Sequence, residues 1–260
     1  MRLIAAASSR LGPRPTNQDA ACAASWTAIV ADGVGGGPGG DLASAAIVHR
    51  IAAGRLRVHD DIDLLGVLRV ANWELRAHAR RDPALSGMAT TLTGLVVASD
   101  GRILLAHSGD SRAYRLRGGE LTRQTRDDSF VQALVDSGAI AEQDAPTHPR
   151  RNIVTASLSG QADDAITVCP ADARSGDRWL LCSDGVTDYL PEPALLPALT
   201  PGTPAEAADA VAELALAGGS RDNVTAVVCD VSPGEVGVRE EPVFHGSAAE
   251  RFAEPLDDVL

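Results

Sequence analysis

The chain has 260 residues, of which 45% are hydrophobic and 22% are charged, so its composition is that of a globular protein and excludes wholesale disorder. Its 35 acidic residues outnumber 23 basic residues, all of them Arg, and the formal charge of −12 argues against a surface that binds nucleic acid or anionic lipid. No apolar run reaches the roughly 18 residues of a membrane span, so we expect no insertion into a bilayer.

The N-terminal part of the chain shows two short apolar runs and two helical patterns. The runs at 3–7 and 27–31 predict buried strands, and the periodicity at 41–56 and 62–81 predicts helices. The first run is too short for a signal peptide, so we interpret it as a strand. Four Cys residues without a CxxC spacing are typical of buried thiols in a reducing compartment, and we therefore expect a cytoplasmic protein.

The middle of the chain is rich in strand signals. Four strands are predicted at 90–98, 102–107, 113–117 and 120–123. Asp100-Gly101 separates the first two and Gly118-Gly119 separates the last two, which is the signature of two-residue hairpins. The pattern predicts an antiparallel meander and disfavours a β-α-β arrangement.

The second half of the chain is more mixed. A helix is predicted at 129–137 and strands at 178–182 and 224–231, and Thr203-Pro-Ala-Glu206 has the residues of a helix capping box. From Pro233 the apolar periodicity stops, and the tail carries seven acidic residues against two Arg. We expect one α+β domain over 1–232, with helices outside antiparallel sheets, followed by an acidic, disordered tail over 233–260.

Aspartate residues recur where predicted strands end or turns begin. Asp32 and Asp184 directly follow apolar strands, Asp222 precedes one, Asp110 lies in a tight turn, and Asp19 closes a polar segment. Burying one unpaired carboxylate is costly. Several of them in one domain therefore need a compensating cation.

A hard divalent metal ion is the natural partner for these carboxylates. Mg²⁺ and Mn²⁺ prefer oxygen ligands. Two such ions about 3.5–4 Å apart can activate one water molecule and hold a phosphoryl oxygen. Gly33 beside Asp32 would let the backbone approach the ions, and Arg14 offers a forked donor for a phosphate group.

Six short motifs follow one another in the chain. They are Arg14-Pro-Thr-Asn-Gln-Asp19, Val30-Ala-Asp-Gly-Val-Gly-Gly36, Gly87-Met-Ala-Thr-Thr-Leu92, His107-Ser-Gly-Asp-Ser-Arg112, Ser183-Asp-Gly-Val-Thr-Asp188 and Ser220-Arg-Asp-Asn-Val224. In this order they resemble the motifs of the metal-dependent type-2C (PPM) protein serine/threonine phosphatases, in their bacterial form. Each motif alone is weak, but the ordered set over 1–231 is specific.

The resemblance implies an αββα four-layer sandwich, with two central antiparallel sheets flanked by helices and metal ions between the sheet ends. It implies that Asp32 bridges two Mn²⁺ or Mg²⁺ ions and that Gly33 supplies a carbonyl to the second ion. Asp184 and Asp222 would hold the first ion, and Asp110, together with Asp184, would hold a third, weaker ion.

The resemblance also implies the reaction and its partners. Arg14 would bind the substrate phosphate, Asp19 would orient metal-bound water, and a flap segment at about 123–158 would border the cleft. The reaction would be hydrolysis of phosphoserine and phosphothreonine monoesters by a hydroxide that bridges the metals, reversing Ser/Thr kinase signalling. The expected partners are phosphorylated proteins and a Ser/Thr protein kinase, without nucleic acid or membrane, and the expected state is a monomer.

Three positions depart from the family pattern. Gln18 stands where many members have Glu, and because its amide brings no charge we predict a weaker second metal site that favours Mn²⁺ over Mg²⁺. Val34 stands where animal members have His. Bacterial members commonly have an apolar residue at this position. Asp128 stands where the flap motif often has His.

Two other functions stay open from the sequence. A pseudophosphatase would keep the fold and bind phosphoproteins without turnover, although the intact set of Asp residues argues against it. The run Gly35-Gly-Gly-Pro-Gly-Gly40 matches the GxGxxG of dinucleotide-binding proteins. Against that alternative, the strands that follow look like hairpins, whereas the dinucleotide fold needs parallel strands.

Overall fold

The computed structural model describes residues 1–34, 39–54, 58–236 and 241–251, and within them the strands form two sheets. The five-stranded sheet has the order β1 (Arg2–Arg10), β10 (Val224–Ser232), β9 (Arg178–Cys182), β6 (Arg112–Arg117) and β7 (Glu120–Arg123). The six-stranded sheet has the order β11 (Val243–Gly246), β2 (Asp19–Ala24), β3 (Thr27–Asp32), β4 (Leu92–Val97), β5 (Ile103–Ser108) and β8 (Thr167–Pro170).

All of these strand pairs are antiparallel. The dinucleotide-binding alternative requires a parallel sheet and is therefore wrong. Of the glycine run that suggested it, residues 35–38 lie outside the described residues.

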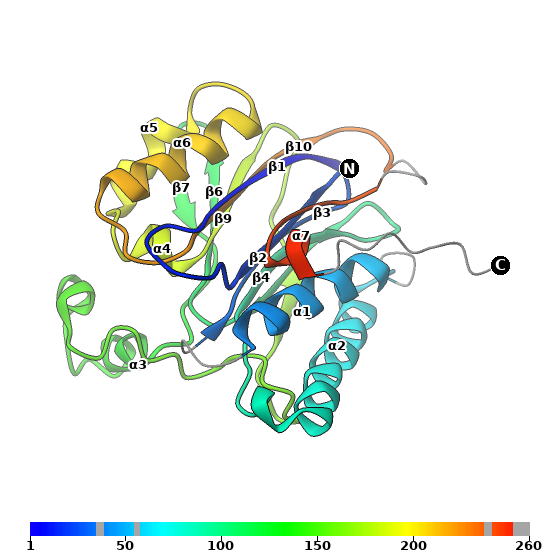
Figure 1. The fold of residues 1–260 in the computed structure, drawn as a ribbon. Coiled ribbons are helices and arrows are strands. Elements are labelled where there is room, and N and C mark those ends of the chain that lie inside the picture. Colours follow the sequence, from blue (N-terminus) through cyan, green and yellow to red (C-terminus); the bar gives the residue numbers. More distant parts are fainter. Residues whose placement is uncertain (35–38, 55–57, 237–240, 252–260) are drawn as a thin grey trace.

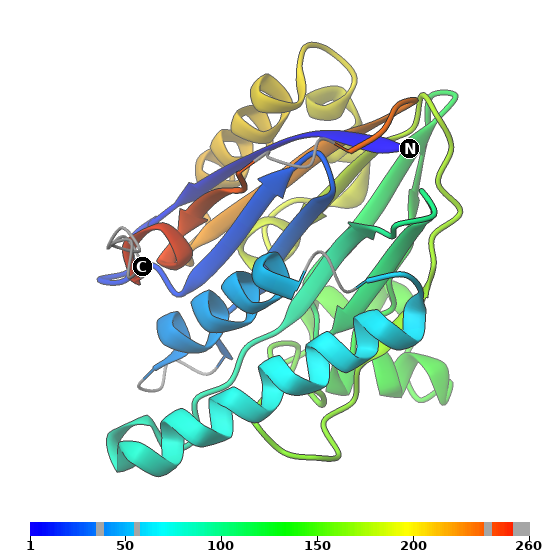
Figure 2. The same cartoon turned by 90° about the vertical axis from the view of Figure 1, so that its right-hand side faces the viewer.

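Helices cover the outer face of each sheet, as Figures 1 and 2 show. The six-stranded sheet carries α1 (Gly40–Gly54), α2 (Asp61–Arg81) and α7 (Ser247–Arg251), and the five-stranded sheet carries α4 (Asp184–Thr187), α5 (Glu192–Leu199) and α6 (Pro204–Ala217). Two 3₁₀ turns, η3 (Pro83–Leu85) and η4 (Glu142–Thr147), and the helix α3 (Phe130–Asp136) complete the described elements. The predicted four-layer αββα sandwich is confirmed.

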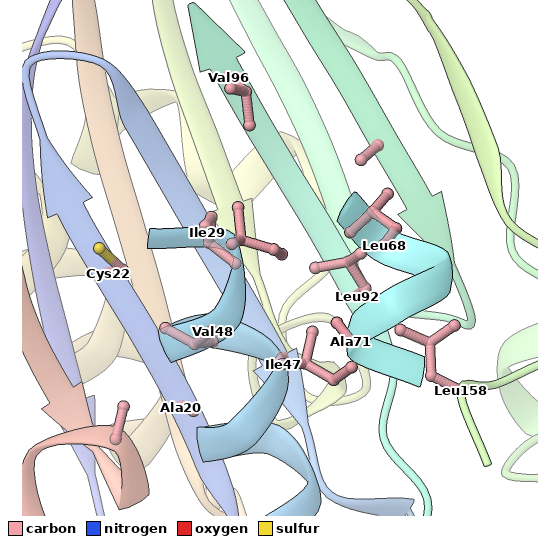
Figure 3. Close-up of a cluster of buried hydrophobic side chains, with 14 of the residues drawn as sticks. Ala20, Cys22, Ile29, Ile47, Val48, Leu68, Ala71, Leu92, Val96 and Leu158 are labelled. Atoms are coloured by element: carbon pink, nitrogen blue, oxygen red, sulfur yellow. The ribbon is translucent and has the colours of Figure 1, made fainter. Parts of the chain in front are cut away.

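Three apolar clusters separate the four layers. One lies between the sheets and includes Trp26 and Trp179, and another lies beneath α5 and α6. The third joins α1 and α2 to the six-stranded sheet, where Ile47 and Leu68 pack over Ile29 (Figure 3). Apart from the two Trp residues, these clusters consist largely of Ala, Val, Leu and Ile, as the low aromatic content of 3% predicts.

Local sequence signals locate several elements accurately. Helix α6 begins with the complete capping box: Thr203 accepts from the backbone of Glu206, whose side chain accepts from the Thr203 backbone. The β6–β7 hairpin turns at Gly118 and Gly119, which both have positive φ, the conformation that a type I′ turn requires and glycine tolerates.

The predicted continuous meander is wrong at one connection. β4 pairs with β5 and β6 pairs with β7, but β5 and β6 lie in different sheets. The segment around Asp110 therefore crosses from one sheet to the other and is not a hairpin turn. Figure 1 shows the segment that contains α3 extending from one end of the sandwich.

The predicted disorder of the tail is wrong over Val243–Arg251. This segment forms β11, which pairs with β2, and α7, which packs against α1. A four-residue strand and a single helical turn are too short to show a periodicity, so the sequence gives no sign of them. Residues 237–240 and 252–260 lie outside the described residues. None of the described helices combines the length and apolarity that crossing a bilayer demands.

Candidate functional site

The Asp residues singled out in the sequence gather at one end of the sandwich. Asp32 ends β3, Asp184 begins α4 directly after β9, and Asp222 precedes β10. Because β9 and β10 are neighbours in the five-stranded sheet, the ends that bear Asp184 and Asp222 lie together. Asp110 joins them from the connection between β5 and β6.

These residues line one cavity of about 300 Å³. Its wall consists of Arg14, Gln18, Asp32, Gly33, Val34, Thr91, Asp110, Asn152, Val154, Asp184, Asp222 and Asn223. Six of the seven predicted site residues are thus in a single wall. The cavity-lining residues carry four carboxyl groups and one guanidinium, a formal charge of −3.

Asp32, Asp110 and Asp184 hold protons more tightly than an ordinary carboxyl group does. Burial raises the pKa of Asp32 and Asp184 well above the ordinary 3.8, and neighbouring Asp charges raise it further. Burial, reinforced by Asp127 and Asp188, raises the pKa of Asp110 to about 7. A buried group of like charges is stabilised only by protons or by a cation.

The donor set fits a hard divalent ion. All four side chains are oxygen donors, which Mg²⁺ and Mn²⁺ prefer. In the described part of the chain no three acidic, His or Cys side chains already stand at the mutual spacing of a ligand shell. The Oδ2 atom of Asp222 accepts from Arg14 Nη2 at 2.7 Å, so binding an ion through Asp222 would involve exchange of that partner.

Two threonines fix the end of β3. The Asp32 amide donates to Thr91 Oγ1 at 3.0 Å, and Thr90 Oγ1 donates to the Asp32 carbonyl at 2.9 Å. Gly33 approaches the first residue of α1 so closely that an added Cβ would lie 2.5 Å from the Gly40 carbonyl carbon. Thr90 and Thr91 therefore position Asp32, a role that the sequence reasoning did not assign to them.

Asp19 lies behind the cavity and does not line it. It is 1% exposed, is the strand partner of Asp32, and accepts from Ser183 Oγ at 2.8 Å. Burial raises its pKa to about 6 despite hydrogen bonds from Thr225 and Ser183. Asp19 therefore supports the Asp32 strand end from the inside.

Asn223 ties three segments of the site together. Its Oδ1 atom accepts from the backbone amide of Gln18 at 2.8 Å, and its Nδ2 atom donates to the backbone carbonyls of Leu11 and Thr16 at 2.9 and 3.1 Å. It thereby holds the loop that carries Arg14. Sequence reasoning treated Asn223 only as the neighbour of Asp222.

A second cavity of about 430 Å³ lies between α3, η4 and the start of α5, and shares Asp110 and Asp184 with the first. Within its wall Asp127 pairs with Arg112 and Arg123, and Arg151 stands 3.6 Å from Asp188. The sequence offered no reason for Asp128 in place of the family's His. In the structure, its carboxylate accepts a hydrogen bond from the Gly109 backbone amide at 3.0 Å and so holds the turn beside Asp110. Part of the predicted flap segment therefore borders the acidic site.

Without divalent ions the protein is expected to lose stability as the pH rises from 5 to 8. The folded-state pKa values of Asp19 and Asp110, about 6 and about 7, exceed the ordinary 3.8. The stability they contribute is therefore complete below the unfolded-state pKa and lost as the pH rises through the folded-state values. In chelator, the unfolding temperature should fall by at least about 5 °C over this interval, and Mn²⁺ should reduce the fall. An unfolding temperature that stays level or rises in chelator would contradict this.

Comparison with known proteins identifies the family to which the chain belongs. The model for protein phosphatase 2C matches residues 14–217. The serine/threonine protein phosphatase PstP of Mycobacterium tuberculosis is 40% identical over 252 residues, which cover 94% of this chain and 48% of that protein. The chain thus spans about half the length of that relative.

A second relative and a solved structure of the PstP catalytic domain are similar to this chain over most of their own length. The serine/threonine phosphatase stp of Listeria monocytogenes is 32% identical over 210 residues, covering 78% of this chain and 83% of that protein. A crystal structure of the PstP catalytic domain in complex with two manganese ions superposes with a TM-score of 0.80 at 39% identity, covering 89% of this chain and 99% of that one.

Proposed function

Because the chain belongs to the protein phosphatase 2C family, we propose that it hydrolyses phosphoserine and phosphothreonine monoesters on proteins. The observation that carries the proposal is the cavity in which Asp32, Asp110, Asp184 and Asp222 face one guanidinium, that of Arg14. Such a cavity suits cations that in turn attract a dianionic phosphate. The PstP and stp phosphatases support the same activity.

The residues present fit two divalent ions. Asp32 and the Gly33 carbonyl would contribute from β3, and Asp184 and Asp222 from the ends of β9 and β10, with Asp110 and Asp184 available for a third ion. Bound ions would make a water molecule nucleophilic and neutralise phosphoryl oxygens. The two manganese ions in the PstP catalytic domain support this assignment.

Arg14 and Asp19 have different tasks in the proposed reaction. Arg14 is 45% exposed at the cavity wall, and its forked guanidinium suits two oxygens of a phosphate group. Asp19 is buried behind Asp32 and would act on the reaction through the orientation of that carboxylate. We therefore assign Arg14 to substrate binding and Asp19 to positioning.

A phosphopeptide assay with increasing Mn²⁺ tests the proposal. Release of inorganic phosphate from phosphoserine and phosphothreonine peptides should rise with Mn²⁺ and stop in excess chelator, whereas a phosphotyrosine peptide serves as the comparison substrate. Binding of the peptides without phosphate release at any Mn²⁺ concentration would instead support the pseudophosphatase alternative.

Changing Gln18 to Glu should strengthen the metal site. Gln18 lines the cavity beside Gly33, and its amide adds no charge there. A carboxylate at this position would attract a nearby cation more strongly. The Mn²⁺ concentration for half-maximal activity should fall several-fold in the Gln18→Glu variant, with a larger gain for Mg²⁺. An unchanged metal requirement would show that residue 18 does not limit ion binding.

The proposed partners are phosphoproteins and the Ser/Thr protein kinases that act on them, with the chain acting as a monomer. We place the protein in the cytoplasm on the chemistry of its cysteines. All four are free thiols, and three are buried. Buried free thiols are typical of proteins from a reducing compartment.

A further inference from the structure

The segment Val243–Arg251, which we call the C-terminal strap, lies against the part of the fold that carries the acidic site. Its strand β11 extends the six-stranded sheet by pairing with β2, and its helix α7 packs on α1. Figures 1 and 2 show the strap beside α1 and β2. Both elements adjoin residues of the cavity wall, because Asp19 at the start of β2 is the strand partner of Asp32 and Gly40 at the start of α1 lies against Gly33.

Ser247 makes the polar contact between the strap and the start of β2 that matters for the acidic site. It is 1% exposed, and its Oγ atom donates to the Asp19 carbonyl at 3.0 Å and lies 2.9 Å from Ser44 Oγ. Ser44 Oγ donates to the Gln18 carbonyl at 2.6 Å. The two hydroxyls together therefore hold two successive backbone carbonyls at the start of β2.

Those carbonyls connect directly to the cavity wall. The Gln18 carbonyl also accepts from the Gly33 amide at 3.1 Å, and Asp19 is the strand partner of Asp32. Movement of the Gln18–Asp19 backbone would thus move the peptide of Gly33 and the end of β3.

Several contacts hold the strap in one place. Gly246 has φ of 61°, and an added Cβ would stand 2.2 Å from the Asp19 carbonyl oxygen, so only glycine permits this approach. His49 of α1 stacks on Phe244 at 4.0 Å and contacts the Ala248 carbonyl at 2.8 Å through Nε2. Arg251 pairs with Asp41 in the first turn of α1.

We propose that Ser247 is a positioning residue for the divalent-ion site and that the C-terminal strap belongs to the catalytic scaffold. By holding the Gln18 and Asp19 carbonyls, Ser247 fixes the Gly33 carbonyl and the Asp32 carboxylate for ion binding. The inference rests on the metal site of the proposed function, and it assigns that site a support more than 200 residues away along the chain.

Titration calorimetry with Mn²⁺ tests the inference on the full chain without substrate. Ser247→Ala should weaken Mn²⁺ binding by about 5- to 10-fold. The Asp19 carbonyl loses its hydrogen bond from Ser247, so the backbone at the start of β2 is held less firmly. The Michaelis constant for phosphopeptide at saturating Mn²⁺ should change much less. The matched serine control is Ser232→Ala at the far end of β10, whose hydroxyl contacts only the adjacent Pro233 carbonyl among described residues.

A second control separates positioning from loss of stability. Val211 lies on the buried face of α6, which packs on the outer side of the five-stranded sheet, so Val211→Ala should lower the unfolding temperature without weakening Mn²⁺ binding. Unchanged Mn²⁺ affinity in Ser247→Ala, or equal weakening in Val211→Ala, would overturn the inference while leaving the proposed function intact. A wild-type chain that binds no Mn²⁺ would overturn both.

Discussion

Replacing Asp184 with Asn is expected to reduce phosphopeptide hydrolysis by at least ~100-fold while the fold is retained. Asp184 lines the acidic cavity, and its pKa is raised by burial and by the charges of Asp110, Asp188 and Asp222. The amide has the same shape but no charge, so one ligand of the proposed ions is lost while packing is kept. Initial rates over a Mn²⁺ series measure the effect.

The same variant should be more stable than the wild type when no metal is bound. Removing one of several like charges relieves repulsion, so the unfolding temperature in chelator at pH 8 should rise. Asp209→Asn is the matched control, because Asp209 is an exposed residue of α6 that pairs with Arg10 away from the cavity. Near-normal turnover by Asp184→Asn would refute the proposed metal assignment.

Replacing Arg14 with Ala is expected to lower kcat/KM for phosphopeptides by about 10- to 100-fold, through loss of charge-assisted hydrogen bonds to the phosphate. Arg14 also holds Asp222 at 2.7 Å and the Arg221 carbonyl at 3.2 Å. Its removal frees the Asp222 carboxylate, so Mn²⁺ affinity should be equal or higher. Steady-state kinetics with calorimetric Mn²⁺ titration separate the two effects.

Two companion variants sharpen the Arg14 result. Arg14→Lys keeps the charge but not the forked geometry, and should recover only part of the activity. Arg10→Ala removes a surface cation that pairs with Asp209 and does not line the cavity, and it should leave activity unchanged. Weaker Mn²⁺ binding in Arg14→Ala would show that Arg14 supports the metal site and does not serve the phosphate alone.

Strong local patterns made much of the fold predictable. A short apolar run predicts a buried strand, as it does correctly at β3, β9 and β10. The Gly-Gly pair predicts the hairpin turn between β6 and β7. β2 escaped detection because it reads Asp-Ala-Ala-Cys-Ala-Ala, in which nearly every side chain is small and none is β-branched. It is a strand because all six of its residues are buried between neighbours, which is a tertiary effect.

The charged residues of the candidate site were predictable from the sequence. The residues that hold them in place through hydrogen bonds were missed. Strand-end Asp residues beside Gly are visible in sequence, and the family motifs give their order. Thr91, Asn223 and Ser247 act through hydrogen bonds to distant backbone atoms. Such partners are set by topology, as when the chain passes between sheets at Asp110, and no local periodicity reveals them.

The ligands proposed for the ions come from both sheets. Asp32 ends a strand of the six-stranded sheet, whereas Asp184 and Asp222 adjoin strands of the five-stranded sheet. Bound ions would therefore join two sheets that otherwise contact each other through the apolar cluster around Trp26 and Trp179 and through hydrogen bonds such as that from Ser183 to Asp19. If ion binding favours one packing of the two sheets, that packing in turn favours ion binding. A partner or a substitution that changes how the two sheets pack should therefore change the affinity for the ions, even when it acts far from the cavity.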